Sequence, residues 1–336
     1  MKTKKTITHQ VSNAERFFNR SPFSVVTMVA RIKGTVEQTT LTNAVKKVQM
    51  RHPLLQSKIV EGENHTLWFS TEDVEEIPVK IIPRVSKNDW LAIHTEETKV
   101  PFDFDSRPAI RFVLVQSKEE SELIILCHHI ICDGLSLGYL VRDLMAYLGD
   151  PNLQVEELPM APVVDENNLP DDISVSGIVK FFIKRMNSKW EENHEYFTNN
   201  DYLAINQAYW SNYSHEVEPI ELGEEETQNL VKKCKETGVS VNTALTTAIT
   251  GAQGLVEGNK PYHPKLVVAA SLRDRLPKNP GEGMGFYAGD VEMNFKYNQK
   301  KSLWQNARSF QKKFAPKTAN ETVFGNILNW VYLDPT

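Results

Sequence analysis

The chain has 336 residues, of which 40% are hydrophobic and 24% charged, and its net charge is −5. This composition is typical of a globular protein with a sizeable core, and the length predicts two domains or one large two-lobed unit. The acidic balance leaves no basic stripe to neutralise phosphates, so nucleic acid is not expected as a partner. Three cysteines are too few for a disulfide framework, which favours a reducing, cytoplasmic setting.

The N-terminus is basic, but no apolar stretch follows it as in a signal peptide. The longest apolar run is much shorter than the ~20 residues that span a bilayer. We therefore expect neither a leader peptide nor a membrane span.

Residues 1–150 predict an N-terminal lobe in which strands and helices mix. Apolar alternation and β-branched residues predict strands over 21–36, 65–70, 79–83, 109–117 and 121–130. Helical spacing of apolar residues predicts helices over 39–53, 86–102 and 135–148. The last two strands are separated by a short polar segment and form a hairpin candidate. Thr39 or Thr40 is the expected cap of the first helix, and Ser86 that of the second.

Residues 151–215 predict a linker and a connecting helix, because 149–172 is rich in proline and acids and 173–197 is helical in pattern. Residues 216–336 predict a C-terminal lobe. Its expected elements are helices over 225–238, 240–256 and 301–315 and a strand over 265–272, with Gly238 ending the first helix and Ser240 capping the second. Because strands and helices do not alternate strictly, we expect α/β lobes with mixed sheets rather than a doubly wound parallel sheet.

The sequence "HHIICDG" follows the last strand of the N-terminal lobe and precedes a helix. Side chains alternate across a strand, so His128 and His129 point to opposite sides and do not readily chelate one metal ion. Gly134 permits a backbone turn that other residues resist. Three interpretations stay open on the residues alone: satisfied core histidines, a metal site using His129 and Asp133, or a histidine acting as general base near pH 7.

Two cysteines flank the histidines and raise a fourth interpretation, a cysteine nucleophile. We expect Cys127 to face the core, since buried free cysteine is common. Cys132 stands among the residues between the histidines and Asp133.

The motif HHxxxDG, read from His128 to Gly134, resembles the signature of the chloramphenicol acetyltransferase-like superfamily. That superfamily includes condensation domains of nonribosomal peptide synthetases, alcohol acetyltransferases and polyketide-associated acyltransferases. Further segments resemble the family in the same order, namely "LTNAVKKVQMRHPLLQSKI", "VPFDFDSRPAIRFVLV", "GVSVNTALTTAIT" and "VVAASLRDRLP…GEGMGFYAGDVEMNF". The likeness looks greatest to the alcohol acetyltransferase and polyketide-associated branch. The "DFGWG" segment of many members is not found, and the C-terminal lobe looks shortened.

The resemblance implies a two-lobed sandwich with mixed sheets and an active site in a tunnel between the lobes. It implies that His129 is the general base and that His128 is a structural neighbour. It also implies that Asp133 pairs with Arg273, or less readily with Arg275, to hold the motif. Backbone N–H groups near Gly134 are candidates for stabilising an oxyanion.

The function implied is acyl transfer from a coenzyme A thioester, or from the phosphopantetheine arm of a carrier protein, to a hydroxyl acceptor. The thioester is a co-substrate, and neither a bound cofactor nor a metal ion is expected. Partners are then the small acyl donor, an alcohol or amine acceptor and an acyl carrier protein. Two alternatives are a condensation-type, amide-forming domain with carrier-bound substrates, and a non-catalytic binding relative.

Overall fold

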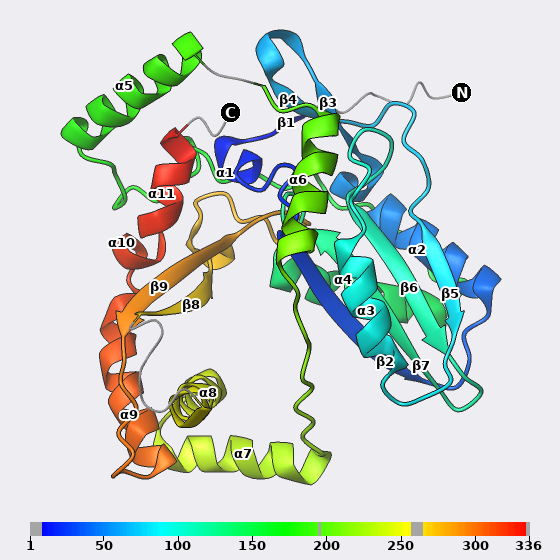
Figure 1. The fold of residues 1–336 in the computed structure, drawn as a ribbon, viewed down its shortest axis with the longest axis vertical. Coiled ribbons are helices and arrows are strands. Elements are labelled where there is room, and N and C mark those ends of the chain that lie inside the picture. The colour runs from blue at the N-terminus through cyan, green and yellow to red at the C-terminus, as the bar shows by residue number, and fades with distance from the viewer. Residues whose placement is uncertain (1–8, 194–195, 257–264, 334–336) are drawn as a thin grey trace. The chain divides into compact units, whose positions relative to one another are not determined.

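The computed structural model describes residues 9–193, 196–256 and 265–333 (Figure 1). The chain forms two compact units. The first comprises Met1–Val217, Arg273–Tyr287 and Leu328–Thr336, and the second Glu218–Leu272 and Ala288–Ile327. The second unit is therefore an insertion, in two pieces, into the sequence of the first.

The first unit is built on a four-stranded sheet in the order β2 (Val25–Lys33), β7 (Glu120–His128), β6 (Ile110–Gln116) and β5 (Val79–Pro83). Strand β7 is antiparallel to β2 and β6, whereas β5 and β6 are parallel. The predicted hairpin and the expected α/β class with mixed sheets are thus confirmed.

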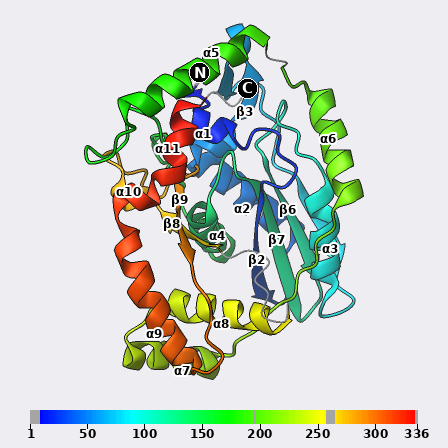
Figure 2. The ribbon, with the colours of Figure 1, turned by 60° about the vertical axis from the view of Figure 1, so that its left-hand side comes forward.

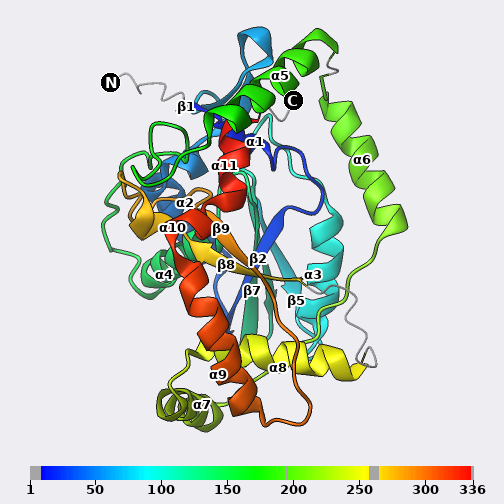
Figure 3. The same ribbon diagram turned by 90° about the vertical axis from the view of Figure 1, so that its left-hand side faces the viewer.

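Strand β7 lies inside this sheet and is buried from Ser121 to His128. Helices α2 (Gln38–Arg51) and α4 (Gly134–Gly149) lie on one face of the sheet, and α3 (Asp89–Lys99) lies on the other (Figure 3). Because both faces are covered, the strand is a continuous apolar run rather than an alternating one. This run leads the chain to the two histidines at its carboxyl end.

Two predicted helix caps are wrong. Helix α2 begins two residues earlier than a cap at Thr39 would place it, with Glu37 at the N-cap and no side-chain capping bond. Helix α3 has Asn88 at its N-cap, again without a side-chain bond. The carboxylate of Asp89 instead accepts hydrogen bonds from the backbone N–H groups of Val85 and Ser86, so the acidic residue in the first turn organises the approach to the helix.

The rest of the first unit surrounds the sheet. Strands β1 (His9–Gln10), β4 (Leu67–Ser70) and β3 (Lys58–Glu61) form a small antiparallel sheet, and α1 (Asn13–Arg16) follows β1. After an irregular stretch, the chain forms α5 (Gly177–Asn193) and α6 (Asn199–Asn212). The pattern predicted only the first of these two helices. The second starts with a capping box between Thr198 and Asp201, a signal that the sequence carries.

The second unit contains α7 (Glu224–Thr237), α8 (Val241–Val256), α9 (Leu303–Phe314), α10 (Asn320–Val323) and an antiparallel pair, β8 (Lys265–Ser271) with β9 (Ala288–Asn294) (Figure 2). Helix α7 ends at Gly238 with φ 72°, and Ser240 accepts a bond from the N–H of Thr243, as predicted. A small core of Val268, Met293 and Phe310 lies between β8, β9 and α9. Helix α11 (Gly325–Tyr332) leads back to the first unit.

Within the described ranges, no helix is both long and apolar enough to cross a bilayer.

Candidate functional site

The motif lies in the first unit, at the junction between β7 and α4. His128 is the last residue of the strand, and the turn that follows begins at His129. The backbone N–H of His128 donates to the carbonyl of Ala109 and that of His129 to the carbonyl of Ser24, both at 2.9 Å. The sheet therefore fixes the backbone of both histidines.

His128 is a structural residue in this arrangement. Its side chain is 0% exposed. Its Nε2 donates to the carbonyl oxygen of Ser21 at 3.0 Å, and its Nδ1 accepts from the N–H of Ile130 at 3.3 Å. Burial lowers the pKa of His128 to about 3, because a charged imidazolium is disfavoured away from water. Both ring nitrogens are thus occupied, and the ring stays neutral.

His129 is only partly buried. Its Nδ1 lies 3.0 Å from the carbonyl oxygen of Cys132. A carbonyl oxygen only accepts, so Nδ1 carries the proton in the neutral ring, and the lone pair is on Nε2. No described residue forms a hydrogen bond with that Nε2. Burial lowers the pKa of His129, although the Cys132 carbonyl and the Asp133 charge oppose it. The ring is therefore a neutral base with its accepting atom unengaged.

Two aromatic rings pack against the imidazole of His129, and a third packs against those two. The ring of Phe18 lies 5.1 Å from it and that of Phe286 5.6 Å, between centroids, while Phe18 and Phe286 are 4.5 Å apart. Trp330 extends the cluster to Phe18 at 5.7 Å and Phe286 at 6.1 Å. These residues come from three distant parts of the sequence. The rings packed against His129 contribute to the burial that lowers its pKa.

Asp133 is 3% exposed and its carboxylate is fully engaged. It caps α4 by accepting from the N–H of Ser136 at 2.7 Å and from its hydroxyl at 2.8 Å. It also accepts from the N–H of Tyr287 at 3.2 Å. Arg273, itself 3% exposed, donates from Nη2 to Oδ1 of Asp133 at 3.1 Å. The structure thus brings Asp133 and Arg273 together in a buried ion pair.

Arg273 also organises the segment that carries Phe286. Its Nη1 donates to the carbonyl oxygens of Gly281 and Gly283, both at 2.9 Å, and its guanidinium lies 4.6 Å from the ring centroid of Tyr287. At Gly285, φ is +148° and an added Cβ would approach the Tyr287 ring to 2.6 Å. Glycine is required there.

A second ion-pair group fastens the same segment to α4. Arg142 donates to both carboxylate oxygens of Glu282 at 2.6 Å. Arg51 contacts Glu282 at 3.2 Å and Asp143 at 2.7 Å. Bidentate contacts of this kind fix geometry as well as charge. Together the two groups hold the 273–287 segment against the helix that follows the motif.

Gly134 is exposed and begins α4. The sequence suggested that Gly134 permits a backbone turn that other residues resist. That reason is wrong, because the φ of Gly134 is not positive. An added Cβ would meet no heavy atom within 4 Å. The first two N–H groups of the helix, those of Gly134 and Leu135, have no intrahelical acceptor. No other described residue packs against the Cα of Gly134 at the start of the helix.

The cysteine interpretation is not supported by the geometry. Cys127 and Cys132 are both 0% exposed. The thiol of Cys132 faces the carbonyl oxygen of His128 at 3.3 Å, and burial raises its pKa well above the usual range. A thiol without thiolate character is a poor nucleophile.

The metal interpretation is not supported either, because the proposed ligand atoms of Asp133 and Nδ1 of His129 already form hydrogen bonds. Asp133 offers its oxygens to Ser136, Arg273 and Tyr287, and Nδ1 of His129 is bound to a carbonyl oxygen. In the part of the chain that the structure describes, no group of three histidine, cysteine or acidic side chains is arranged to hold a metal ion.

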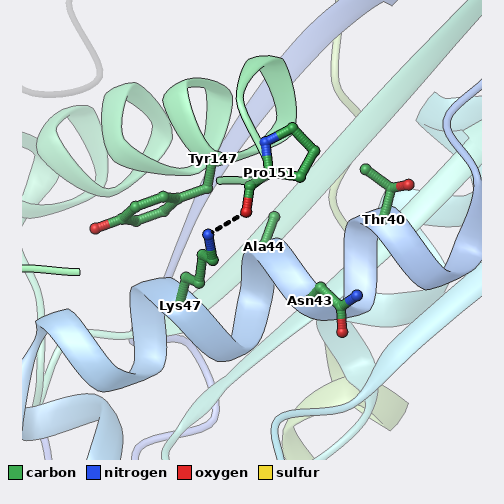
Figure 4. A pocket seen from close by; sticks show the side chains of 6 residues that line it. All are labelled: Thr40, Asn43, Ala44, Lys47, Tyr147 and Pro151. Atoms are coloured by element: carbon green, nitrogen blue, oxygen red, sulfur yellow. Dashed lines mark hydrogen bonds between the residues drawn. The ribbon is translucent and has the colours of Figure 1, made fainter. Parts of the chain in front are cut away.

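A separate hollow of about 300 Å³ lies between α2 and α4 (Figure 4). It is lined by Thr40, Asn43, Ala44, Lys47, Tyr147 and Pro151. Lys47 donates to the carbonyl oxygens of Pro151 at 2.5 Å and Leu153 at 2.8 Å. The lysine fastens the chain that leaves α4, and none of the motif residues lines this hollow.

Comparison with known proteins points to one family. Residues 9–165 match the family model described as "Condensation domain". A linear gramicidin synthase of Brevibacillus parabrevis is 31% identical over 137 residues, which are 39% of this chain and 3% of that protein. A nonribosomal peptide synthetase, agiA of Aspergillus flavus, is 32% identical over 120 residues, 35% of this chain and 2% of that protein. The chain thus spans only a few per cent of the length of these relatives.

Solved structures share the fold at low sequence identity. The first condensation domain of the calcium-dependent antibiotic synthetase, in complex with a substrate analogue, aligns with a TM-score of 0.61 and 13% identity over 97% of this chain and 78% of its own. Polyketide synthase associated protein 5 from Mycobacterium tuberculosis aligns with a TM-score of 0.56 and 16% identity over 94% of this chain and 74% of its own. Residues 9–165 are thus similar in sequence to condensation domains, and the chain shares the fold of condensation domains and of a polyketide synthase associated protein.

Proposed function

We propose that this chain catalyses acyl transfer of the condensation type, joining a carrier-bound acyl thioester to an amine or hydroxyl nucleophile. The observation that carries the proposal is the hydrogen bond from Nδ1 of His129 to the Cys132 carbonyl at 3.0 Å. It fixes the tautomer whose Nε2 accepts a proton. Burial keeps that ring neutral at pH 7, so the base is in its active form.

The chemistry requires one proton to move twice. As the acceptor nitrogen or oxygen bonds to the thioester carbonyl carbon, Nε2 of His129 takes its proton. When the carbon–sulfur bond breaks, the same proton passes to the leaving thiolate. The N–H groups of Gly134 and Leu135 are donors for the oxyanion formed between these steps. No covalent acyl-enzyme is needed, so positioning of two substrates supplies much of the rate.

Support for carrier-bound donors comes from the relatives, which are peptide synthetases, and from the condensation-domain match over residues 9–165. These findings favour the condensation-type alternative over the transfer to a hydroxyl acceptor that the sequence motif alone suggested. We therefore rank the carrier-bound thioester and an amine first. The experiment below also includes the coenzyme A donor and the hydroxyl acceptor, for comparison.

The experiment measures free thiol released from acyl-phosphopantetheinyl carrier protein or acyl-coenzyme A, each with an amine or an alcohol. His129→Gln keeps a polar side chain but removes the base, and His65→Gln replaces an exposed histidine as the matched control. We expect acceptor-dependent thiol release with the carrier donor, lost in His129→Gln and kept in His65→Gln. Equal turnover of His129→Gln would overturn the role of the base. No release with any donor would favour a non-catalytic binding relative.

A further inference from the structure

Helix α5 (Gly177–Asn193) carries an exposed apolar stripe that the proposed reaction does not use. Ile178, Phe182, Met186 and Trp190 are spaced four residues apart and are 72%, 59%, 59% and 45% exposed. Residues at this spacing lie on one face of a helix. Phe181, 61% exposed, widens the apolar surface. Scattered exposed apolar residues are ordinary, but a contiguous patch marks an interaction site.

The same helix is strongly basic over most of its length. It carries Lys180, Lys184, Arg185 and Lys189, and its acidic residues come only at the end. Lys180 with Lys184, and Arg185 with Lys189, are like-charged pairs four residues apart, which destabilise a helix in water. No described carboxylate forms an ion pair with Lys184, Arg185 or Lys189. An anionic counterpart would relieve both unfavourable features.

Contacts on the opposite side of α5 set which face is presented. Ile183 is 8% exposed. Asn187 donates to the carbonyl oxygen of Tyr332 at 3.0 Å, and the ammonium of Lys180 lies 4.7 Å from the Tyr332 ring centroid. Figure 1 shows α5 beside the end of α11, which carries Tyr332. The helix is thus held in the first unit by one side, and the apolar side chains of the stripe stay exposed on the other.

We infer that α5 docks the protein on an anionic membrane surface, lying in the plane of the interface. Apolar and aromatic side chains flanked by lysine and arginine are the pattern of interfacial helices. The four cations exclude a span, in agreement with the absence of a spanning helix among the described residues. Protein interfaces are depleted in lysine, and three of these four cations are lysines. That composition favours anionic lipid over a protein partner.

The test uses the full chain and lipid vesicles in a sedimentation assay. One set contains phosphatidylcholine alone, and the other adds phosphatidylserine. We expect binding to the anionic vesicles, weakened by salt, since exposed charges are screened. Phe182→Ser with Met186→Ser removes the centre of the stripe and should abolish binding. The triple variant Lys184→Gln, Arg185→Gln and Lys189→Gln should lower binding on the order of a hundredfold, at roughly fivefold for each cation lost.

Matched variants keep the comparison specific. Phe23→Ser removes another exposed aromatic, 66% exposed. The triple variant Lys232→Gln, Lys233→Gln and Lys235→Gln removes three exposed charges of α7 and gives the same net charge as the α5 triple. Both controls should bind as the unmodified chain does. All substituted α5 residues are exposed, and equal melting temperatures verify the fold.

Quenching by bromolipids provides an independent readout of contact. We expect tryptophan quenching in anionic vesicles and its reduction in Trp190→Phe. Failure of the unmodified chain to bind anionic vesicles, or equal loss in the α7 controls, overturns the inference. So does a change in oligomeric state of the Phe182→Ser, Met186→Ser variant without lipid, which would assign the stripe to a second copy of the chain.

Discussion

Replacing Arg273 with methionine removes the cation buried against Asp133. The carboxylate, 3% exposed, would lose the guanidinium at 3.1 Å, and the carbonyls of Gly281 and Gly283 would lose their shared donor. Breaking a buried pair from one side costs about 3–5 kcal/mol. Because Asp133 keeps its bonds from Ser136 and Tyr287, we expect the lower end of this range.

The measurement is thermal unfolding followed by circular dichroism. A loss of about 3 kcal/mol corresponds to a drop in Tm of roughly 6–12 °C, at ~2–4 °C per kcal/mol for a unit of 150–250 residues. Arg275→Met changes the same short turn and is the control, with a smaller expected effect. Adding Asp133→Asn to Arg273→Met should recover part of the loss, because the unpaired charge is then removed. An unchanged Tm for Arg273→Met, or equal losses for the two arginine variants, would refute the buried pair as an anchor.

Three further predictions concern titration and reactivity. The substitution Phe286→Ala should admit water to the imidazole of His129. Because burial is the main cause of the lowered pKa of His129, this pKa should rise toward 6.5 in an NMR titration. The absence of a rise would contradict the role of the aromatic rings. Iodoacetamide at neutral pH should leave Cys132 unmodified in the folded chain, since burial raises the thiol pKa; modification with parallel loss of thiol release would restore the nucleophile interpretation. Stability in urea should fall as pH drops from 6.5 to 5, by up to about 1.36 kcal/mol per pH unit from His128. The unfolded chain binds a proton there that His128, with a pKa of about 3, does not; rising stability in this window would contradict the neutral ring.

Local patterns predicted many of the helices and strands, though not α6, β9 or α11, and they predicted the division between the two histidines. Strand alternation separates His128 from His129, and the structure gives them different burial and different partners. The apolar run before them predicts a strand whatever surrounds it. Helix caps were less predictable, since an oxygen-bearing side chain near a helix start is not always the one that bonds, as α2 and α3 show.

The surroundings of His129 could not be predicted from local patterns. Phe18, Phe286 and Trp330 meet through tertiary packing, and no local pattern singled out any of the three as a neighbour of His129. The pairing of Asp133 with Arg273 across 140 residues was reached through the resemblance and not through spacing. Periodicity describes one element at a time, so contacts between distant elements lie beyond it.

The 140-residue separation of Asp133 and Arg273 sets the order of events on the ribosome. At about 5–20 residues per second, Arg273 is added roughly 7–28 s after Asp133. During that interval the carboxylate can form its bonds with Ser136, three residues away, but it has no guanidinium. The start of α4 is therefore established from local contacts first, and the aromatic cover of His129 is completed only when residue 330 has been synthesised.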